Sequence, residues 1–197
     1  MNGSFVSLLS IALGAILVGN VVFTQLLGAG PFLGSSGSMG TAVRMGTVVT
    51  LVMGLTSAVC WPINEYVLGP NGLKYIESAV FFLTAVFLVQ LLDVLVQKLL
   101  PGRKPLVGGR LPLAANCAVL GVVFQNVQNG SGFLQSLTYA VAGGLGFLMA
   151  VVLFAGVRER IEFAECPKSF EGAPIAFVAA GLLTLCFAGF SSLNVFG

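Results

Sequence analysis

Charged side chains are scarce in this sequence: they make up 8% of its 197 residues, against 57% hydrophobic ones. Soluble domains carry about 25% charged residues, so this composition excludes an ordinary soluble protein and indicates an integral membrane protein. The net charge of +2 is spread over predicted loops. That excludes the dense basic patch which nucleic-acid binding requires.

Several motifs of redox and metal chemistry are also missing. The chain has no histidine, no glycine fingerprint of a dinucleotide-binding fold and no flavin-attachment motif, so it cannot oxidise a nicotinamide cofactor by itself. The four cysteines are Cys60, Cys117, Cys166 and Cys186. They follow none of the short CxxC spacings of zinc or thioredoxin sites. Three lie in or beside predicted spans and Cys166 in a predicted cytoplasmic loop, so no disulfide is expected.

Long apolar stretches dominate what is present. Six are long enough to cross roughly 30 Å of hydrocarbon, which takes about 20 helical residues. They lie near residues 4–27, 42–62, 76–98, 111–127, 132–157 and 174–193. The first is preceded by no Lys or Arg and is too long for a signal-peptide core, so it is expected to remain as a span. The sequence predicts an all-α integral membrane protein of six transmembrane helices, forming a single membrane domain over 1–197.

Basic residues are distributed unevenly between the two sides of the membrane. The predicted loops at 28–41, 99–110 and 158–173 share one side with the flank of the second span. Together with Lys98 at the end of the third span, these segments hold every basic residue except Lys74. The positive-inside rule therefore places both termini outside the cytoplasm.

The chain divides into two halves at LLPGRKPLVGGRLP (99–112), where prolines flank a basic, glycine-rich loop. Repeat one covers about 1–100 and repeat two about 108–197, with three spans each. An odd number of spans per half inverts the second half relative to the first, and in such proteins the functional site lies at the midplane between the repeats. Asn20 and Asn116, each in an apolar stretch near the start of its half, form a weak internal echo.

The segment LLGAGPFLGSSGSMG (26–40) carries glycines and a proline at a density that stops a helix. Because the segment remains rather apolar, we interpret it as a broken or re-entrant half-helix, which membranes tolerate only where protein shields the free backbone groups. An ordinary cytoplasmic loop is the alternative. With the Asn116 echo, broken half-helices are expected at spans one and four.

An Asn116–Cys117 pair is the most chemically distinctive feature. No charged residue occurs between Arg110 and Arg158, and Cys117 is predicted about six residues into the fourth span. A thiolate there would need a metal or a positive dipole for stability. A lone intramembrane cysteine is otherwise a small apolar packing residue.

Other polar residues of the spans have two interpretations each. Gln90 and Asp93 share one face of the third span and form a candidate ion or proton site, although Asp93 is equally a solvated carboxylate near the helix end. Five amides line a polar seam or bond across helices: Asn20, Gln25, Asn116, Gln125 and Asn126. The glycines of the fifth span are predicted to pack closely against another helix. Arg158 and Arg160 are expected to interact with the carbonyls that end that span.

Three stretches carry a resemblance to a known family. They are LLGAGPFLG (26–34), LPLAANCAVLGVVFQN (111–126) and GVRERIEFAECPKSFEGAPIAFVAAGLLTLCFAGFSSL (156–193). They closely resemble the A-type membrane subunit of the Rnf ferredoxin:NAD oxidoreductase, and the E-type subunit of the sodium-pumping NADH:quinone reductase (Nqr) is similar. The resemblance extends over nearly the whole chain, and the GPFLG and RERIEF patterns favour Rnf.

The resemblance implies a membrane component of a prokaryotic inner membrane that packs against a homologous, inverted E-type subunit. Each of the two offers one cysteine from a first half-helix and one from an NCA motif, and the four thiolates share a [2Fe-2S] cluster in the membrane. The cluster relays electrons from the cytoplasmic side to flavin-bearing subunits, coupled to Na+ or H+ transport. The implied partners are that E-type subunit, flavin-bearing membrane and outer-side subunits, a cytoplasmic ferredoxin-type subunit and the lipid bilayer.

Carried over by position, Cys117 matches the second ligand, whereas Gly30 stands before Pro31 where the family has the first. The resemblance places Asn20, Gly28, Pro31 and Asn116 around the cluster. Glycine has no side chain that could act as a ligand. Four explanations remain: a substitute ligand, an electron path that bypasses the site, an engineered Cys→Gly change, or loss of the cluster. Cys60 and Cys186 are poor substitutes, because no ligand motif flanks either.

The expected function is that of a membrane subunit of an ion-translocating Rnf complex, an enzyme only as part of that complex. The alternatives are an E-type subunit of Nqr, a scaffold without a cluster, and an inverted-repeat transporter that uses the broken first span without a metal.

Overall fold

The computed structural model describes residues 2–99, 116–161, 167 and 172–191. Within these ranges all regular elements are helices. The α-helices are α1 (Asn2–Leu13), α2 (Ala29–Ser35), α3 (Met39–Ile63), α4 (Glu77–Leu99), α6 (Cys117–Gln128), α7 (Phe133–Ile161) and α8 (Ala173–Ser191). Short π-helical turns at Gly14–Val18 and Asn64–Leu68 continue α1 and α3, and a 3-10 turn at Lys74–Ile76 leads into α4.

Four of the described helices are long and apolar enough to cross a membrane: Met39–Leu68, Lys74–Leu92, Phe133–Ile161 and Ala173–Phe190. They correspond to the second, third, fifth and sixth predicted spans. The first and fourth correspond to shorter apolar helices, Leu8–Val18 and Cys117–Gln128. The 12 residues of α6 rise only about 18 Å, too little to cross a bilayer. The all-α membrane class is confirmed for the described residues.

Two predicted helix boundaries are wrong, and an asparagine is the cause in each case. The first span was expected to reach residue 27, but the helix ends at Val18, because the side-chain oxygen of Asn20 accepts the Val22 backbone N–H at 3.0 Å. The fourth span was expected from residue 111, but α6 begins at Cys117 with Asn116 as its N-cap. Asparagine competes with helical backbone hydrogen bonds in this way.

The segment 26–40 contains the seven-residue helix α2 rather than only loop, as the half-helix interpretation predicted. The predicted loop at 158–173 begins too early, because α7 continues to Ile161. The basic residues of the predicted loop at 99–110, together with Cys166 and Lys168, lie outside the described residues.

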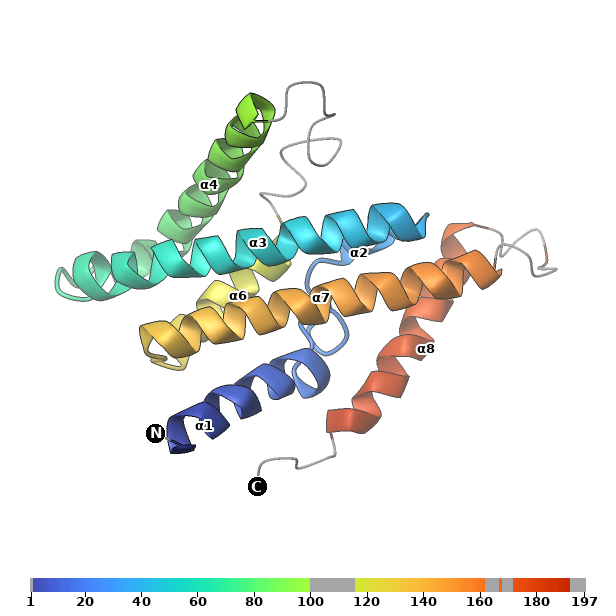
Figure 1. Cartoon of the computed structure of the whole chain (residues 1–197), viewed down its shortest axis with the longest axis horizontal. Coiled ribbons are helices and arrows are strands. Elements are labelled where there is room, and N and C mark those ends of the chain that lie inside the picture. Colours follow the sequence, from blue (N-terminus) through green and yellow to red (C-terminus); the bar gives the residue numbers. More distant parts are fainter. Residues whose placement is uncertain (1, 100–115, 162–166, 168–171, 192–197) are drawn as a thin grey trace.

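The antiparallel pair α3 and α7 forms the centre of the molecule (Figure 1). Glycines bring the two helices together. A Cβ added at Gly46 would lie 2.4 Å from Leu148 Cδ1, and one at Gly144 would lie 2.7 Å from Thr50 Cα. No side chain fits at either position, so the predicted close packing of the fifth-span glycines is confirmed here.

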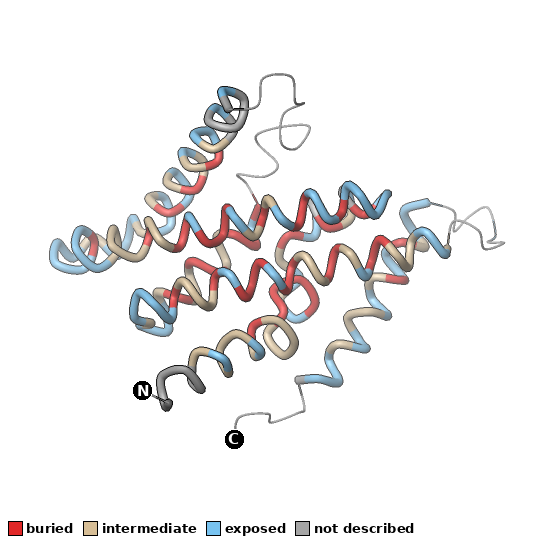
Figure 2. Tube along the Cα trace, viewed as in Figure 1, coloured by how far each residue is buried: buried red, intermediate tan, exposed pale blue. Residues whose placement is uncertain are grey.

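Helices α4 and α8 leave this central pair at opposite ends and on opposite sides (Figure 1). Their apolar windows are 17% and 11% buried, against 56% for α7, and Figure 2 shows most of both helices exposed. Such apolar faces are compatible with lipid or with other membrane subunits as their cover.

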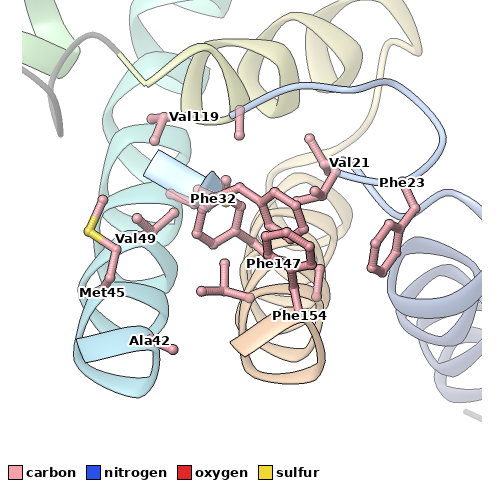
Figure 3. Close-up of a cluster of buried hydrophobic side chains, with 14 of the residues drawn as sticks. Val21, Phe23, Phe32, Ala42, Met45, Val49, Val119, Phe147 and Phe154 are labelled. Atoms are coloured by element: carbon pink, nitrogen blue, oxygen red, sulfur yellow. The ribbon is translucent and has the colours of Figure 1, made fainter. Parts of the chain in front are cut away.

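Aromatic side chains hold α2 and the unwound segment 19–28 against the central pair (Figure 3). Phe32 of α2 stacks on Phe154 of α7 with ring centroids 4.5 Å apart. Phe23 of the unwound segment stacks on Phe187 of α8 at 4.3 Å. Phe147 is fully buried beside them. The non-helical residues 20–23 are therefore buried in protein, as a membrane interior requires, whereas Leu26 is exposed.

Candidate functional site

Cys117 is the first residue of α6, and its thiol is exposed. Its Sγ accepts the backbone N–H of Gly28 at 3.0 Å, and Gly28 is the N-cap of α2. The starts of α2 and α6 therefore meet at this sulfur. We call this meeting point, formed by Gly28, Gly30, Asn116 and Cys117, the helix-start junction.

Gly28 is required by the geometry of the helix-start junction. Its φ is +78°, and an added Cβ would lie 2.9 Å from Phe147 Cε2 and 3.0 Å from Asn116 Oδ1. Phe147 is the middle residue of α7, which runs from Phe133 to Ile161. The junction therefore lies beside the middle of a helix that is long enough to span the bilayer.

Asn116 is buried, with 1% of its surface exposed. Its Oδ1 accepts the Ala118 backbone N–H at 3.1 Å and caps α6. Its Nδ2 is buried without a hydrogen-bond partner in the described part of the chain. Asn116 therefore acts in the helix-start junction as the cap of α6.

The electrostatics of the junction favour negative charge. Helix starts carry unsatisfied N–H groups and the positive end of the helix dipole. The exposed side chain of Cys117 lies at these helix starts.

Gly30 is the second residue of α2, followed in that helix by Pro31. It is exposed, and a Cβ added there would meet no atom within 4 Å. The glycine at this position is therefore not imposed by packing. A Cβ fits at Gly30 without moving the backbone.

The polar seam expected from five amides is largely a set of bonds between helices. Asn20 Nδ2 donates to Gly146 O of α7 at 3.0 Å. Asn126 Nδ2 donates to Ser57 Oγ and to Ser136 O, each at 3.0 Å. Gln125 accepts the Tyr139 hydroxyl proton. Gln25 is half-buried.

The remaining predicted residues lie apart from the junction. Gln90 is exposed on α4, and the side chain of Asp93, on the same helix, lies outside the described residues, so the ion-path prediction stays untested. Cys60 is buried with Phe81 and Val123, and Cys186 is exposed on α8. Among the residues that the structure describes, no three His, Cys, Asp or Glu side chains gather as a metal site.

One contact near the junction could not be read from the sequence. Arg158 was expected to interact with the end of its own helix, but its Nη1 donates to Leu33 O at 2.9 Å and to Ser36 Oγ at 3.0 Å. These atoms lie at the C-terminal end of α2, where a cation opposes the negative helix end. Arg158 thus fixes the end of α2 that is farther from the junction.

This chain is similar in sequence to known membrane protein subunits. A family model described as "Rnf-Nqr subunit, membrane protein" matches residues 8–194. The A-type subunit of the Na(+)-translocating ferredoxin:NAD(+) oxidoreductase complex of Acetobacterium woodii is 43% identical over 190 residues, covering 96% of this chain and 99% of the relative. The A-type subunit of the ion-translocating oxidoreductase complex of Syntrophotalea carbinolica is 44% identical over 188 residues, covering 95% and 97%. Its counterpart in Azoarcus sp. is 42% identical over 187 residues, covering 94% and 97%.

Proposed function

This chain belongs to the Rnf-Nqr family of membrane protein subunits, and we propose that it is the A-type subunit of an ion-translocating ferredoxin:NAD oxidoreductase complex. Full-length relatives bearing that name support the proposal. The helices long enough to span a prokaryotic inner membrane support it too. The absence of histidine and of a dinucleotide fingerprint leaves cofactor oxidation to other subunits.

The proposal rests on the exposed side chain of Cys117, which begins α6 and lies beside the middle of α7. A thiol in that position faces either lipid or another membrane subunit. Lipid cannot complete a ligand set around a thiolate, whereas a second subunit can. A shared site between two membrane subunits is therefore the arrangement that gives this residue a function.

The donor set of this chain fits one corner of a shared [2Fe-2S] cluster. Such a cluster supplies one-electron transfer when bound, and four cysteine thiolates ordinarily hold it. Cys117 supplies one thiolate at the helix-start junction, and Gly30 supplies none. The two ligands per subunit that the resemblance implies are thus not both present, and any further donors must come from other subunits.

The partner we propose is a homologous E-type subunit of inverted orientation, lying against the exposed Cys117 and Gly30. Within this chain, α2–α3–α4 and α6–α7–α8 are proposed as the inverted halves of a six-span arrangement. Each unit is a short helix followed by two long ones, and α4 and α8 leave the antiparallel α3–α7 pair at opposite ends (Figure 1). The basic-residue asymmetry supports termini on the outer side.

Ion coupling is proposed for Na+ or H+. The name of the Acetobacterium woodii relative supports Na+ for that protein. In this chain Gln90 and Asp93 remain the proposed contributors to an ion path, because an acidic residue within a span is a candidate ion site by default.

A second function, that of a scaffold without a cluster, is favoured by one observation. Gly30 sits in open space, so a ligand could be lost there without any change in fold. A scaffold would still assemble with the other subunits, but it would carry no electrons.

The test of the proposed function is complementation in a strain that lacks this chain. Membranes with the wild-type chain should restore ferredoxin-dependent NAD+ reduction, and the tagged chain should purify with a homologous membrane subunit. Restored assembly without restored reduction would favour the scaffold. A functional chain purified without partners would contradict both functions and favour a transporter. Accessibility of a cysteine placed at Arg103 from the cytoplasmic side checks the orientation.

A further inference from the structure

A cavity of about 380 Å³ lies where α3 ends and α4 begins, away from the helix-start junction. Three parts of the chain line it. The turn after α3 contributes Asn64. The 3-10 turn that leads into α4 contributes Lys74, and the first turn of α4 contributes Glu77 and Ser78. The last two turns of α6 contribute Phe124, Val127 and Gln128. Its size falls in the usual range of small-ligand sites.

Five of the lining side chains are polar: Asn64, Lys74, Glu77, Ser78 and Gln128. None of the five makes a hydrogen bond or ion pair within the described part of the chain. Single unpaired polar groups at a surface are hydrated and carry no meaning. Five that converge on one hollow from three parts of the chain form a preassembled set of donors and acceptors.

Aromatic residues place this cavity at the membrane–water interface. Trp61 and Tyr66 contact each other edge-to-face at 6.4 Å, and Tyr66 and Tyr75 are 72% and 80% exposed. Trp and Tyr concentrate at the headgroup level of bilayers. Farther along α4, apolar side chains such as Leu83 and Phe87 are exposed, as expected where acyl chains lie.

The charges of the cavity define the ligand. Lys74 and Glu77 are three residues apart across a helical start, a spacing that puts side chains about 5–6 Å apart. The lysine ammonium suits a phosphate, and the glutamate carboxylate suits a cation at a short distance from it. Asn64 and Gln128 add amide oxygens that accept N–H bonds.

The groups that line the cavity also distinguish a primary ammonium from a quaternary one. A primary ammonium has N–H donors for the carboxylate and the amide oxygens, whereas a quaternary ammonium has none and is bound by aromatic cages. Among the described residues that line the cavity, Phe124 is the one aromatic side chain. We propose that this cavity binds the headgroup of a zwitterionic phospholipid with a primary ammonium, of the phosphatidylethanolamine class. Phosphate lies on Lys74, ammonium on Glu77, and the glycerol backbone against Phe124 and Val127.

The experiment uses the full-length chain in its purified complex, placed in phosphatidylcholine nanodiscs with an increasing fraction of phosphatidylethanolamine. Native mass spectrometry counts the retained lipids. Lys74→Met should lower retention of phosphatidylethanolamine, because the phosphate contact is lost, and it should lower retention of phosphatidylglycerol in a parallel series of nanodiscs that contain this lipid instead. Glu77→Gln should lower retention of phosphatidylethanolamine only. Each change should raise the fraction needed for half-occupancy about five- to tenfold, the effect of one charged hydrogen bond at a partly exposed site.

Matched controls are present in the chain. Lys98→Met removes a lysine from the other end of α4, and Glu65→Gln removes an exposed carboxylate from the same end of the bundle outside the cavity. Both should behave as wild type. All four side chains lie at the surface or are half-buried, so folding is preserved, which thermal unfolding verifies.

Three results would overturn the proposal. One is equal retention of phosphatidylcholine and phosphatidylethanolamine by the wild type. A second is displacement of the lipid by soluble glycerophosphoethanolamine at matched concentration, which would assign the site to a free metabolite. The third is crosslinking of Lys74 to another protein subunit in a complex that retains no lipid there.

Discussion

The helices α2 and α6 start side by side, and they differ in how their first turns are made. α6 begins with an asparagine cap and a cysteine, whereas α2 begins with Gly28 as its cap and Gly30 two residues farther on. The start of α2 points at the sulfur in the start of α6, since the Gly28 N–H donates to Cys117 Sγ. One start carries a thiol, and the other carries only backbone.

In the start of α2, the residue that determines the backbone conformation differs from the residue at the expected ligand position. The glycine start of α2 is fixed by contacts on Gly28, where the φ is positive and no Cβ fits. Gly30, two residues on, is under no such constraint. The backbone of the junction is thus fixed although Gly30 has no side chain. Substitutions at the starts of α2 and α6 should therefore differ in their effects on stability and on electron transfer.

The largest effect is expected from Cys117→Ala, which removes the thiol of the α6 start. In the anaerobically purified complex, the electron paramagnetic resonance signal of the proposed cluster and ferredoxin-dependent NAD+ reduction should both be lost. Stability should change little, because the thiol is exposed and its N–H···S bond is weak.

Cys186→Ala is the matched control, because that thiol is also exposed in a helix, and it should leave signal and rate unchanged. If the Cys117→Ala complex keeps its full rate, the α6 start is no more functional than the α2 start. The scaffold function would then replace the electron relay.

Gly28→Ala should have the next largest effect, on stability rather than on chemistry. Alanine at φ +78° with atoms of Phe147 and Asn116 about 3 Å from its Cβ should lower the free energy of unfolding by about 2–4 kcal/mol. Thermal unfolding in detergent measures the change. Gly30→Ala, with open space around its Cβ, should stay within about 0.5 kcal/mol of wild type. Equal losses for the two variants would show that the α2 start is not held as described.

The fold was predictable where it depends on long apolar stretches. Six were found in the sequence, and each corresponds to a described apolar helix. Boundaries were missed at Asn20 and Asn116, because a single side-chain oxygen decides between helix and cap, while hydropathy averages over a whole window. The inward packing of α3 on α7 was indicated by its glycines, but the outward course of α4 and α8 had no sequence signal.

The site was predictable only in part, for a similar reason. Cys117 and Gly30 were found from local motifs. Their meeting depends on a contact between residues 89 apart in the chain, and the Arg158 contact with α2 joins residues 125 apart. No local pattern encodes such distances. The resemblance supplied the pairing of the half-helices, and the structure supplied the position of the junction along α7.

Asn116→Ala should have a smaller effect than Gly28→Ala. The loss of the N-cap hydrogen bond to Ala118 should cost about 1 kcal/mol, partly offset because the unpartnered Nδ2 disappears as well. Asn116→Ser keeps a capping oxygen without that amide and should match or exceed wild-type stability. Thermal unfolding of both variants makes the comparison. A serine variant less stable than the alanine variant would mean that Nδ2 has a partner in the assembled complex.

The smallest change in stability is expected from Gly30→Cys, which gives the α2 start the side chain that the resemblance implies there. An added Cβ meets no atom within 4 Å, so the free energy of unfolding should change by less than about 0.5 kcal/mol. Iron retained per complex should be unchanged or higher, because a second thiolate then faces the same proposed partner subunit as Cys117.

Gly34→Cys is the matched control, since Gly34 is also exposed in α2 with open space around it, and it should not alter iron content. An increase in iron content for Gly30→Cys but not for Gly34→Cys would show that the starts of α2 and α6 differ in function only because α2 lacks the thiol. A loss of iron at Gly30 alone would mean that another group already occupies the space in front of α2, and that this chain uses a different fourth donor.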